Sequence, residues 1–230
     1  MGRIHFIGGE KGGVGKSLVA RLLAQHLVDR GVPFAAFDTD RSHPSMLRYY
    51  AEFASVADVD QAESLDRLLE SACASDQQRV VVDLAAQTTP AMVRWIVDSE
   101  LVEAAREIGV DLVWWQVMDA GRDVVELLRA HLDRFGDAMG LVLVLNEIRG
   151  ERFELLEESG LRARAEAMGA KIVRIRRLQD ETLRRIDALG ASFWAATNPA
   201  EGAPALGILE RRRVRSWIER VYEEFQAAGV

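Results

Sequence analysis

Two lysines and three glycines near the amino terminus have the types and spacing that bind phosphate. Segment 10–17 reads Glu-Lys-Gly-Gly-Val-Gly-Lys-Ser and holds two of the three lysines among 29 basic residues. Glycines let backbone N–H groups curl around phosphate oxygens, and the start of a following helix adds partial positive charge. We expect Lys16 to hold the β- and γ-phosphates of a nucleotide and the Ser17 hydroxyl to ligate Mg²⁺. The predicted nucleotide contacts are Gly12, Gly13, Val14, Gly15, Lys16, Ser17 and Leu18.

Short β-branched runs alternate with longer amphipathic stretches, which is typical of an α/β fold with a mostly parallel sheet flanked by helices on both faces. The phosphate loop follows the first expected strand and opens the first expected helix, as such a loop requires. With 230 residues and 49% hydrophobic content, the chain is predicted to form one domain, 1–230, with its C-terminal helix packed on it. Strands are expected at 3–8, 33–38, 79–84, 110–117, 141–146 and 171–175, and the clearest helices at 16–30, 89–108, 121–135 and 208–227.

The phosphate loop departs from the ordinary pattern G-x-x-x-x-G-K-[ST], because Glu10 stands where the first glycine belongs. Its second lysine gives K-G-G-x-G-K-[ST], which resembles the deviant Walker A motif of the ParA/MinD family of ATPases. The resemblance implies a single-domain, SIMIBI-like P-loop NTPase fold, slow Mg²⁺-dependent ATP hydrolysis, and a homodimer with ATP sandwiched between subunits. It also implies that Lys11 reaches the partner's ATP, where a charge lent in trans stabilises the transition state.

The resemblance assigns roles to carboxylates that follow two expected strands. Asp38-Thr39-Asp40 ends the second strand, where Asp38 would lie near the Mg²⁺ shell and Asp40 would position or activate the attacking water. Asp83 ends the third strand like a Walker B carboxylate, and it would hold Mg²⁺ through a water. Segments 41–44 and 85–88 depart from the family's D-x-D-P-Q and D-x-P-x-G, so altered switch contacts are expected.

Asn146 ends the strand Leu-Val-Leu-Val-Leu-Asn. In the family an asparagine at this place hydrogen-bonds the adenine, and an amide supplies the paired donor and acceptor that a base edge requires. A strand-ending turn residue is the alternative. The landmarks run from residue 10 to residue 146 in the expected order, and the opening Ile-His-Phe and the strand around Trp114 most resemble ParA-like proteins of plasmid transfer and mobilisation, the TraL or MobD type.

Basic residues gather late in a chain whose net charge is −7. Residues 170–230 contain 11 Lys and Arg against 8 Asp and Glu. Four of these arginines, Arg211, Arg212, Arg213 and Arg215, are candidate contacts to the phosphate backbone of nonspecific DNA, with a scattered solvated face as the alternative. The last helix has an apolar stripe, for which packing on its own domain is favoured over a membrane anchor.

These features favour an ATP-dependent dimerising switch that partitions or positions plasmid DNA or a transfer complex, with an adaptor or cargo protein stimulating hydrolysis. No apolar run is long enough to span a bilayer and no signal peptide is evident, so a cytoplasmic location is expected, with nucleoid association if DNA is bound. A small-molecule enzyme of synthetase type and a metallocentre-maturation ATPase remain alternatives. Cys73 is the only cysteine, so one subunit lacks the pair that the latter usually needs.

Overall fold

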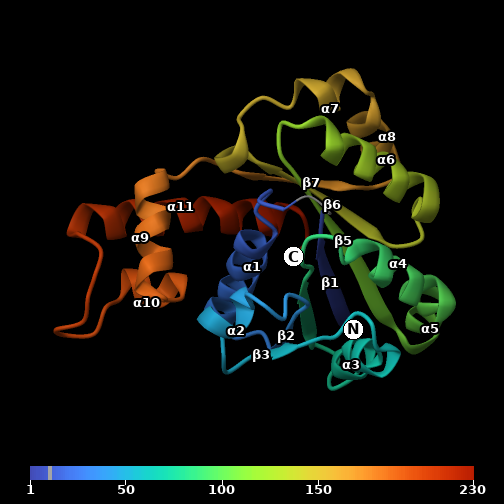
Figure 1. The fold of residues 1–230 in the computed structure, drawn as a ribbon, viewed down its shortest axis with the longest axis horizontal. Helices are drawn as coiled ribbons and strands as arrows, with labels where there is room; N and C mark the ends of the chain where they lie inside the picture. The colour runs from blue at the N-terminus through green and yellow to red at the C-terminus, as the bar shows by residue number, and fades with distance from the viewer. Residues whose placement is uncertain (10–11) are drawn as a thin grey trace.

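The computed structural model describes residues 1–9 and 12–230. Seven parallel strands form one sheet in the order β3-β2-β4-β1-β5-β6-β7 (Figure 1). The central strands are rich in β-branched and aromatic residues without polar alternation, as expected for strands covered on both faces. The strands are β1 (Gly2–Gly8), β2 (Phe34–Asp38), β3 (Ala54–Val56), β4 (Arg79–Asp83), β5 (Val110–Met118), β6 (Gly140–Asn146) and β7 (Lys171–Ile175).

Helices cover both faces of this sheet. Figure 1 shows α1 and α11 on one side and α3 to α8 on the other, while α9, α10 and the start of α11 project beyond the sheet. The helices are α1 (Lys16–Arg30), α2 (Ser45–Tyr49), α3 (Ala62–Ala72), α4 (Thr89–Asp98), α5 (Leu101–Ile108), α6 (Arg122–Phe135), the short 3₁₀ helix η1 (Glu147–Arg149), α7 (Glu154–Glu158), α8 (Leu161–Ala167), α9 (Asp180–Leu189), α10 (Phe193–Thr197) and α11 (Ile208–Ala227).

The sequence predicts one helix at 89–108, and this prediction is wrong in its continuity. The structure divides the segment into α4 and α5, because Glu100 takes a left-handed φ of 48° between them. No glycine or proline marks this break, so the sequence pattern gave no signal for it. The prediction also lacks β3, a strand of three residues at one edge of the sheet.

The apolar stripe of α11 is buried against the domain. Four residues of this stripe are each at most 4% exposed and belong to the core: Val214, Trp217, Val221 and Phe225. Glu224, on the same helix, accepts a hydrogen bond from the backbone N–H of Arg174 in β7 at 2.9 Å. This helix therefore covers the open edge of the last strand. Within the described residues, no helix is long and apolar enough to cross a membrane.

The strand order places the carboxyl ends of the central strands next to one another. The chain leaves β1 for α1 on one face, whereas β4 and β5 are followed by helices on the other face. In open α/β sheets, such a reversal opens a crevice at the carboxyl ends of the strands, where ligands bind. The phosphate loop follows β1 at this edge, and Asp38, Asp83 and Asn146 are the last residues of β2, β4 and β6.

Candidate nucleotide-binding site

The described part of the phosphate loop has the backbone that its glycines predict. Gly13 and Gly15 adopt φ values of 83° and 105°, in the left-handed region that disfavours side chains. A Cβ on Gly15 would also lie 2.3 Å from the Nδ2 atom of Asn146. Glycine is therefore required at position 15 for two reasons. Lys11, the predicted catalytic lysine of the partner's site, lies outside the described residues, as does Glu10.

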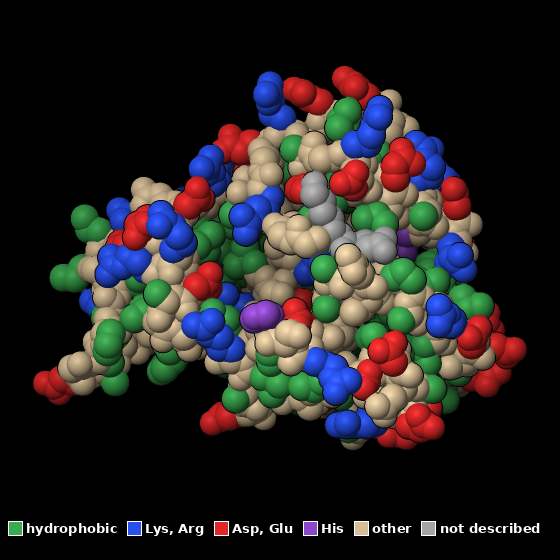
Figure 2. Space-filling view, in the orientation of Figure 1, with side chains coloured by type: hydrophobic (Ala, Val, Ile, Leu, Met, Phe, Trp, Pro, Cys, Tyr) green, Lys and Arg blue, Asp and Glu red, His purple; other side chains and the backbone are tan. Residues whose placement is uncertain are grey.

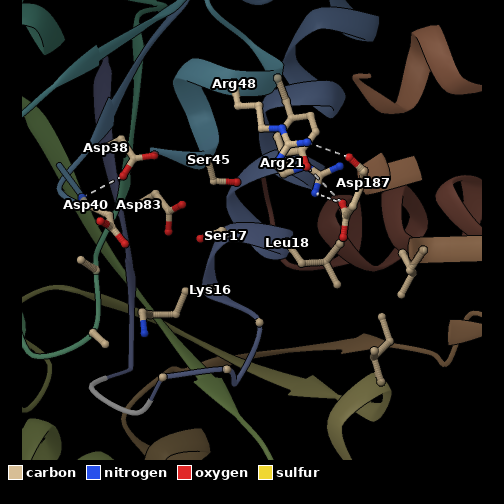
Figure 3. A pocket seen from close by; sticks show the side chains of 18 of the residues that line it. Lys16, Ser17, Leu18, Arg21, Asp38, Asp40, Ser45, Arg48, Asp83 and Asp187 are labelled. Atoms are coloured by element: carbon tan, nitrogen blue, oxygen red, sulfur yellow. Dashed lines mark hydrogen bonds and ion pairs between the residues drawn. The ribbon is translucent and has the colours of Figure 1, made fainter. Parts of the chain in front are cut away.

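A cavity of about 700 Å³ opens beside this loop. Figure 3 shows Lys16 and Ser17 at the start of α1 with three carboxylates, Asp38, Asp40 and Asp83, grouped on one side. The structure thus brings together most of the residues singled out from the sequence. Those on the cavity wall are Gly12, Gly13, Gly15, Lys16, Ser17, Leu18, Asp38, Asp40 and Asp83. Val14 is 1% exposed and belongs to the core.

The carboxylates after β2 organise their own loop. Asp38 accepts hydrogen bonds from the backbone N–H groups of Asp40 and Met46, both at 2.9 Å. Oδ1 of Asp40 accepts from the N–H groups of Ser42 and His43, also at 2.9 Å. These bonds turn the chain sharply into α2, and on Asp40 they are made by Oδ1. Asp38 and Asp40, which the sequence analysis places near Mg²⁺ and the attacking water, therefore also fix the backbone of segment 39–46.

Thr39 links the loops that follow β2 and β4, a role the sequence analysis did not foresee. Its hydroxyl donates to the carbonyl of Asp83 at 3.2 Å and accepts from the N–H of Ala85 at 2.7 Å. The only feature of the sequence that could have indicated this role is the position of Thr39 between the two aspartates. Two residues beyond Ala85, Gln87 keeps a left-handed φ of 68° at the position of the glycine in D-x-P-x-G. A residue other than glycine therefore takes a positive φ at the place where D-x-P-x-G has its glycine.

Asp83 has the environment of a cation ligand. It is 2% exposed, and its Oδ1 atom has no hydrogen-bond partner within the described part of the chain. Burial and the neighbouring carboxylate of Asp38 raise its pKa to about 7, although a hydrogen bond from Ser17 and the charge of Lys16 oppose this. Burial likewise raises the pKa of Asp38. A cation bound here would relieve the repulsion between these two carboxylates.

Asp38, Asp83 and the Ser17 hydroxyl suit Mg²⁺ better than a transition metal. The described residues contain no group of three or more His, Cys, Asp or Glu side chains that could hold a metal alone. Mg²⁺ is usually bound through one or two carboxylates together with substrate phosphates and water. The donors present here fit that mode of binding.

Asn146 is placed differently from the sequence-based expectation. It is fully buried and absent from the cavity wall. Its Nδ2 donates to the carbonyl of Val14 at 2.7 Å, and its Oδ1 accepts from the N–H of Ile148 at 3.3 Å. In this geometry the amide holds the phosphate loop against the end of β6. The wall beyond the loop is instead formed by Ile148 and Arg149, which follow Asn146, and by Asp180, Leu183 and Arg184 of α9.

A cluster centred on Asp187 forms the far wall of the cavity, and sequence reasoning missed it. Arg21 of α1 pairs with Oδ1 of Asp187 at 2.7 Å and stacks over the ring of Tyr49 at 3.6 Å. Arg48 of α2 donates to the backbone carbonyl of Asp187 at 3.1 Å (Figure 3). Because these residues come from α1, α2 and α9, the cluster joins the helix of the phosphate loop to the projecting part of the molecule.

The four late arginines differ in the contacts they make within the chain. Arg211 donates to the carbonyl of Leu206 at 3.2 Å, and Arg215 donates to the carbonyl of Thr197 at 2.6 Å and to Asn198 at 3.0 Å. These two arginines hold the loop between α10 and α11. Arg212 and Arg213 are exposed and line a separate groove. Arg211 and Arg215 therefore bond to backbone carbonyls near the start of α11, and Arg212 and Arg213 line the groove.

The fold and the loop together define a P-loop nucleotide-binding protein. Residues 5–187 match the CobQ/CobB/MinD/ParA nucleotide binding domain, and the chain belongs to this family. It is similar to the protein MobD of Acidithiobacillus ferrooxidans, with 31% identity over 176 residues that cover 74% of this chain and 75% of MobD. It is also similar to the protein TraL of Escherichia coli, with 25% identity over the whole of both chains.

The solved structures support the same fold. A putative plasmid partition protein from Borrelia burgdorferi B31, bound to AMPPNP, is 14% identical with a TM-score of 0.55, and the match covers 98% of this chain and 99% of the other. The family match and the similarity to MobD and TraL confirm the resemblance to the ParA/MinD family and to its TraL or MobD type, first seen in the sequence motifs.

Proposed function

We propose that this protein is an Mg²⁺-dependent ATPase that dimerises around ATP and so partitions or positions plasmid DNA or a transfer complex. The observation that carries the proposal is the convergence of Lys16, Ser17 and the carboxylates Asp38, Asp40 and Asp83 on one cavity beside the phosphate loop. The family supplies nucleotide binding. Similarity to proteins named MobD and TraL supports a role in plasmid transfer.

The residues on the cavity wall have different roles in the proposed hydrolysis of ATP. Lys16 and the N–H groups of the loop bind the phosphate oxygens and stabilise the charge that develops as the bond between the β–γ bridging oxygen and the γ-phosphorus breaks. Ser17, Asp38 and Asp83 would hold Mg²⁺, which when bound would neutralise further charge on the phosphates. Oδ2 of Asp40 orients the attacking water and accepts its proton while Oδ1 keeps the loop in place.

Replacing Lys16 by alanine tests the assignment of the loop. Without this ammonium group the phosphate oxygens lose their main cationic partner, so ATP binding should be abolished. Isothermal calorimetry with MgATP on the folded variant measures this directly. Wild-type affinity in Lys16→Ala would refute the proposed site.

The proposed dimer gives Lys11 its function. Its charge would act on the partner's ATP, so Lys11→Ala should bind ATP with unchanged affinity but hydrolyse it slowly. Turnover at the wild-type rate, measured above the dimerisation concentration, would remove Lys11 from the mechanism. An adaptor or cargo protein is proposed to raise the slow basal rate, and the cytoplasm is the proposed location.

Nonspecific DNA is the second proposed partner, and the exposure of Arg212 and Arg213 supports it. Two such pairs in a dimer would give more phosphate contacts than one, so binding should require ATP and fall steeply with salt. Gel shifts with the Asp40→Ala variant, which should accumulate the ATP-bound dimer, test this. Absence of binding at low salt would exclude the DNA proposal.

The alternatives receive less support. Cys73 is exposed at the end of α3, whose Ala72 lies beside Gly2 at the start of β1. The phosphate loop follows the other end of that strand, so this thiol lies away from the nucleotide cavity. A subunit-bridging metal cluster at the nucleotide site is therefore disfavoured. A small-molecule synthetase would need a second substrate pocket joined to the same cavity.

A further inference from the structure

A second cavity lies between α11 and the loop that follows β7. Its volume is about 420 Å³. It shares no lining residue with the nucleotide cavity, yet the two are close, because Gln179 lines one and the next residue, Asp180, lines the other. We call this second cavity the α11 groove. Its lining residues are Arg177, Leu178, Gln179, Leu209, Arg212, Arg213, Ser216, Trp217 and Arg220.

The charge of the α11 groove opposes that of the whole chain. All four of its charged lining residues are arginines, although the net charge of the chain is −7. Within the described residues, no carboxylate pairs with Arg212, Arg213 or Arg220, and all three are exposed. Arg177 shares two exposed acids, Glu151 at 3.8 Å and Asp180 at 3.3 Å. The groove therefore attracts an anionic occupant.

The floor and rim of the α11 groove are apolar. Leu178 and Trp217 are buried at 6% and 4% exposure, and Trp217 is fixed by a hydrogen bond from Nε1 to the carbonyl of Arg176 at 2.7 Å. Leu209 stands at the rim with 69% of its surface exposed. Apolar side chains gather at the end of the projection that contains the start of α11 (Figure 2). DNA contacts made through phosphates to Arg212 and Arg213 would leave this apolar surface uncovered, so it indicates a second kind of ligand.

We propose that the α11 groove binds an acidic peptide segment of a partner protein. Carboxylates of the segment pair with Arg212, Arg213 and Arg220, and an apolar side chain covers Leu209 and the floor. Arginine and aromatic residues around a partly buried pocket are the usual composition of a binding hot spot. The inference rests on the proposed function, because it gives the chemistry of the adaptor or cargo protein. It also places that partner against the loop that leads into α9.

The experiment selects peptides and then locates them. A phage-displayed library of random dodecapeptides is selected on the full-length protein with MgATP, and the enriched peptides are labelled for fluorescence anisotropy. Two variants remove the groove's features: Leu209→Ser and Arg212→Ser/Arg213→Ser. Ile208→Ser is the matched control, since Ile208 is 76% exposed beside Leu209 but does not line the groove. Arg134→Ser on α6 is the matched charge control.

Enriched peptides should combine Asp or Glu with a large apolar residue. Their Kd should rise about tenfold or more in both groove variants and stay within about twofold in both controls, as expected when a hot-spot contact is lost. Enrichment of peptides without acids, or equal binding to all variants, would overturn the proposal. ATP affinity measured on the same proteins separates this failure from a failure of the proposed function.

Two further probes test DNA and an anionic membrane surface as alternative ligands of the groove. A short random-sequence DNA duplex that loses affinity with the arginine variant but not with Leu209→Ser, in the absence of acidic peptide binding, would make the groove a nucleic-acid surface. Anionic phosphatidylserine vesicles that lose affinity equally with Leu209→Ser and Ile208→Ser would make the tip of α11 a membrane contact. Either result would replace the peptide proposal.

Discussion

Replacement of Asn146 by alanine separates two roles for this residue, base recognition and support of the phosphate loop. The sequence predicts a contact with adenine, whereas in the structure both polar atoms of the amide bond to protein atoms, Nδ2 to the Val14 carbonyl and Oδ1 to the Ile148 N–H. We therefore expect the variant to bind ATP and GTP more weakly by the same factor.

The size of the effect follows from burial. Each lost hydrogen bond costs about 1 kcal/mol, and leaving a buried acceptor such as the Val14 carbonyl unsatisfied costs about 1–3 kcal/mol. The free energy of unfolding of the nucleotide-free protein should thus fall by about 2–4 kcal/mol. If nucleotide binding must restore the position of the phosphate loop in the variant, part of the binding free energy is used for this. The affinity for nucleotide then falls about tenfold for each 1.4 kcal/mol so used.

The assay combines urea unfolding of the nucleotide-free protein with calorimetric titration of ATP and GTP. A second variant checks the geometry: Gly15→Ala places a Cβ 2.3 Å from Nδ2 of Asn146, so its cost should be smaller in the Asn146→Ala background, where only the left-handed φ of 105° remains unfavourable. The loop-support role would be refuted if Asn146→Ala kept wild-type stability and lost affinity for ATP but not for GTP.

Three other changes test different parts of the structure. Asp40→Ala should bind ATP but hydrolyse it at least about a hundredfold more slowly, the usual worth of a general base; wild-type turnover by phosphate release would exclude Asp40. Asp187→Asn weakens the pair with the buried Arg21 and should destabilise the fold by about 1–3 kcal/mol in thermal unfolding, an expectation that unchanged stability would contradict. Burial lowers the pKa of His131 from 6.5 to about 4. Between these two pH values, His131 binds a proton in the unfolded chain but not in the folded chain. Wild type should therefore lose about 2 kcal/mol of stability relative to His131→Phe when the pH falls from about 7 to about 5. A difference in stability that stays constant with pH would show that the pKa of His131 is not lowered.

The sequence predicts best those elements whose residues act locally. The phosphate loop, α1 and the strands ending in Asp38, Asp83 and Asn146 follow from motif spacing and β-branched runs, and the structure has them within one or two residues. The break at Glu100 and the strand β3 escape prediction, because both depend on tertiary packing and neither carries a glycine, a proline or a long apolar run.

The same distinction applies to the site. Lys16, Ser17 and the three acids were found because each stands at the start of a helix or at or just after the end of a strand, in a known motif. Thr39, Arg21 and Asp187 were not, since their partners lie 44 to 166 residues away along the chain. The position of Asn146 also depends on such a distant contact: the motif names the residue, but the hydrogen bond to Val14, 132 residues away, sets its geometry.

The covered edge of β7 has a consequence for behaviour at high concentration. An exposed strand edge offers unpaired N–H and C=O groups to any other strand, which is a common route to aggregation. Here the N–H of Arg174 is already bonded to Glu224 of α11, and the opposite edge of the sheet is the three-residue strand β3. The bonded N–H of Arg174 and the shortness of β3 therefore both disfavour the addition of strands from neighbouring molecules at the edges of the sheet.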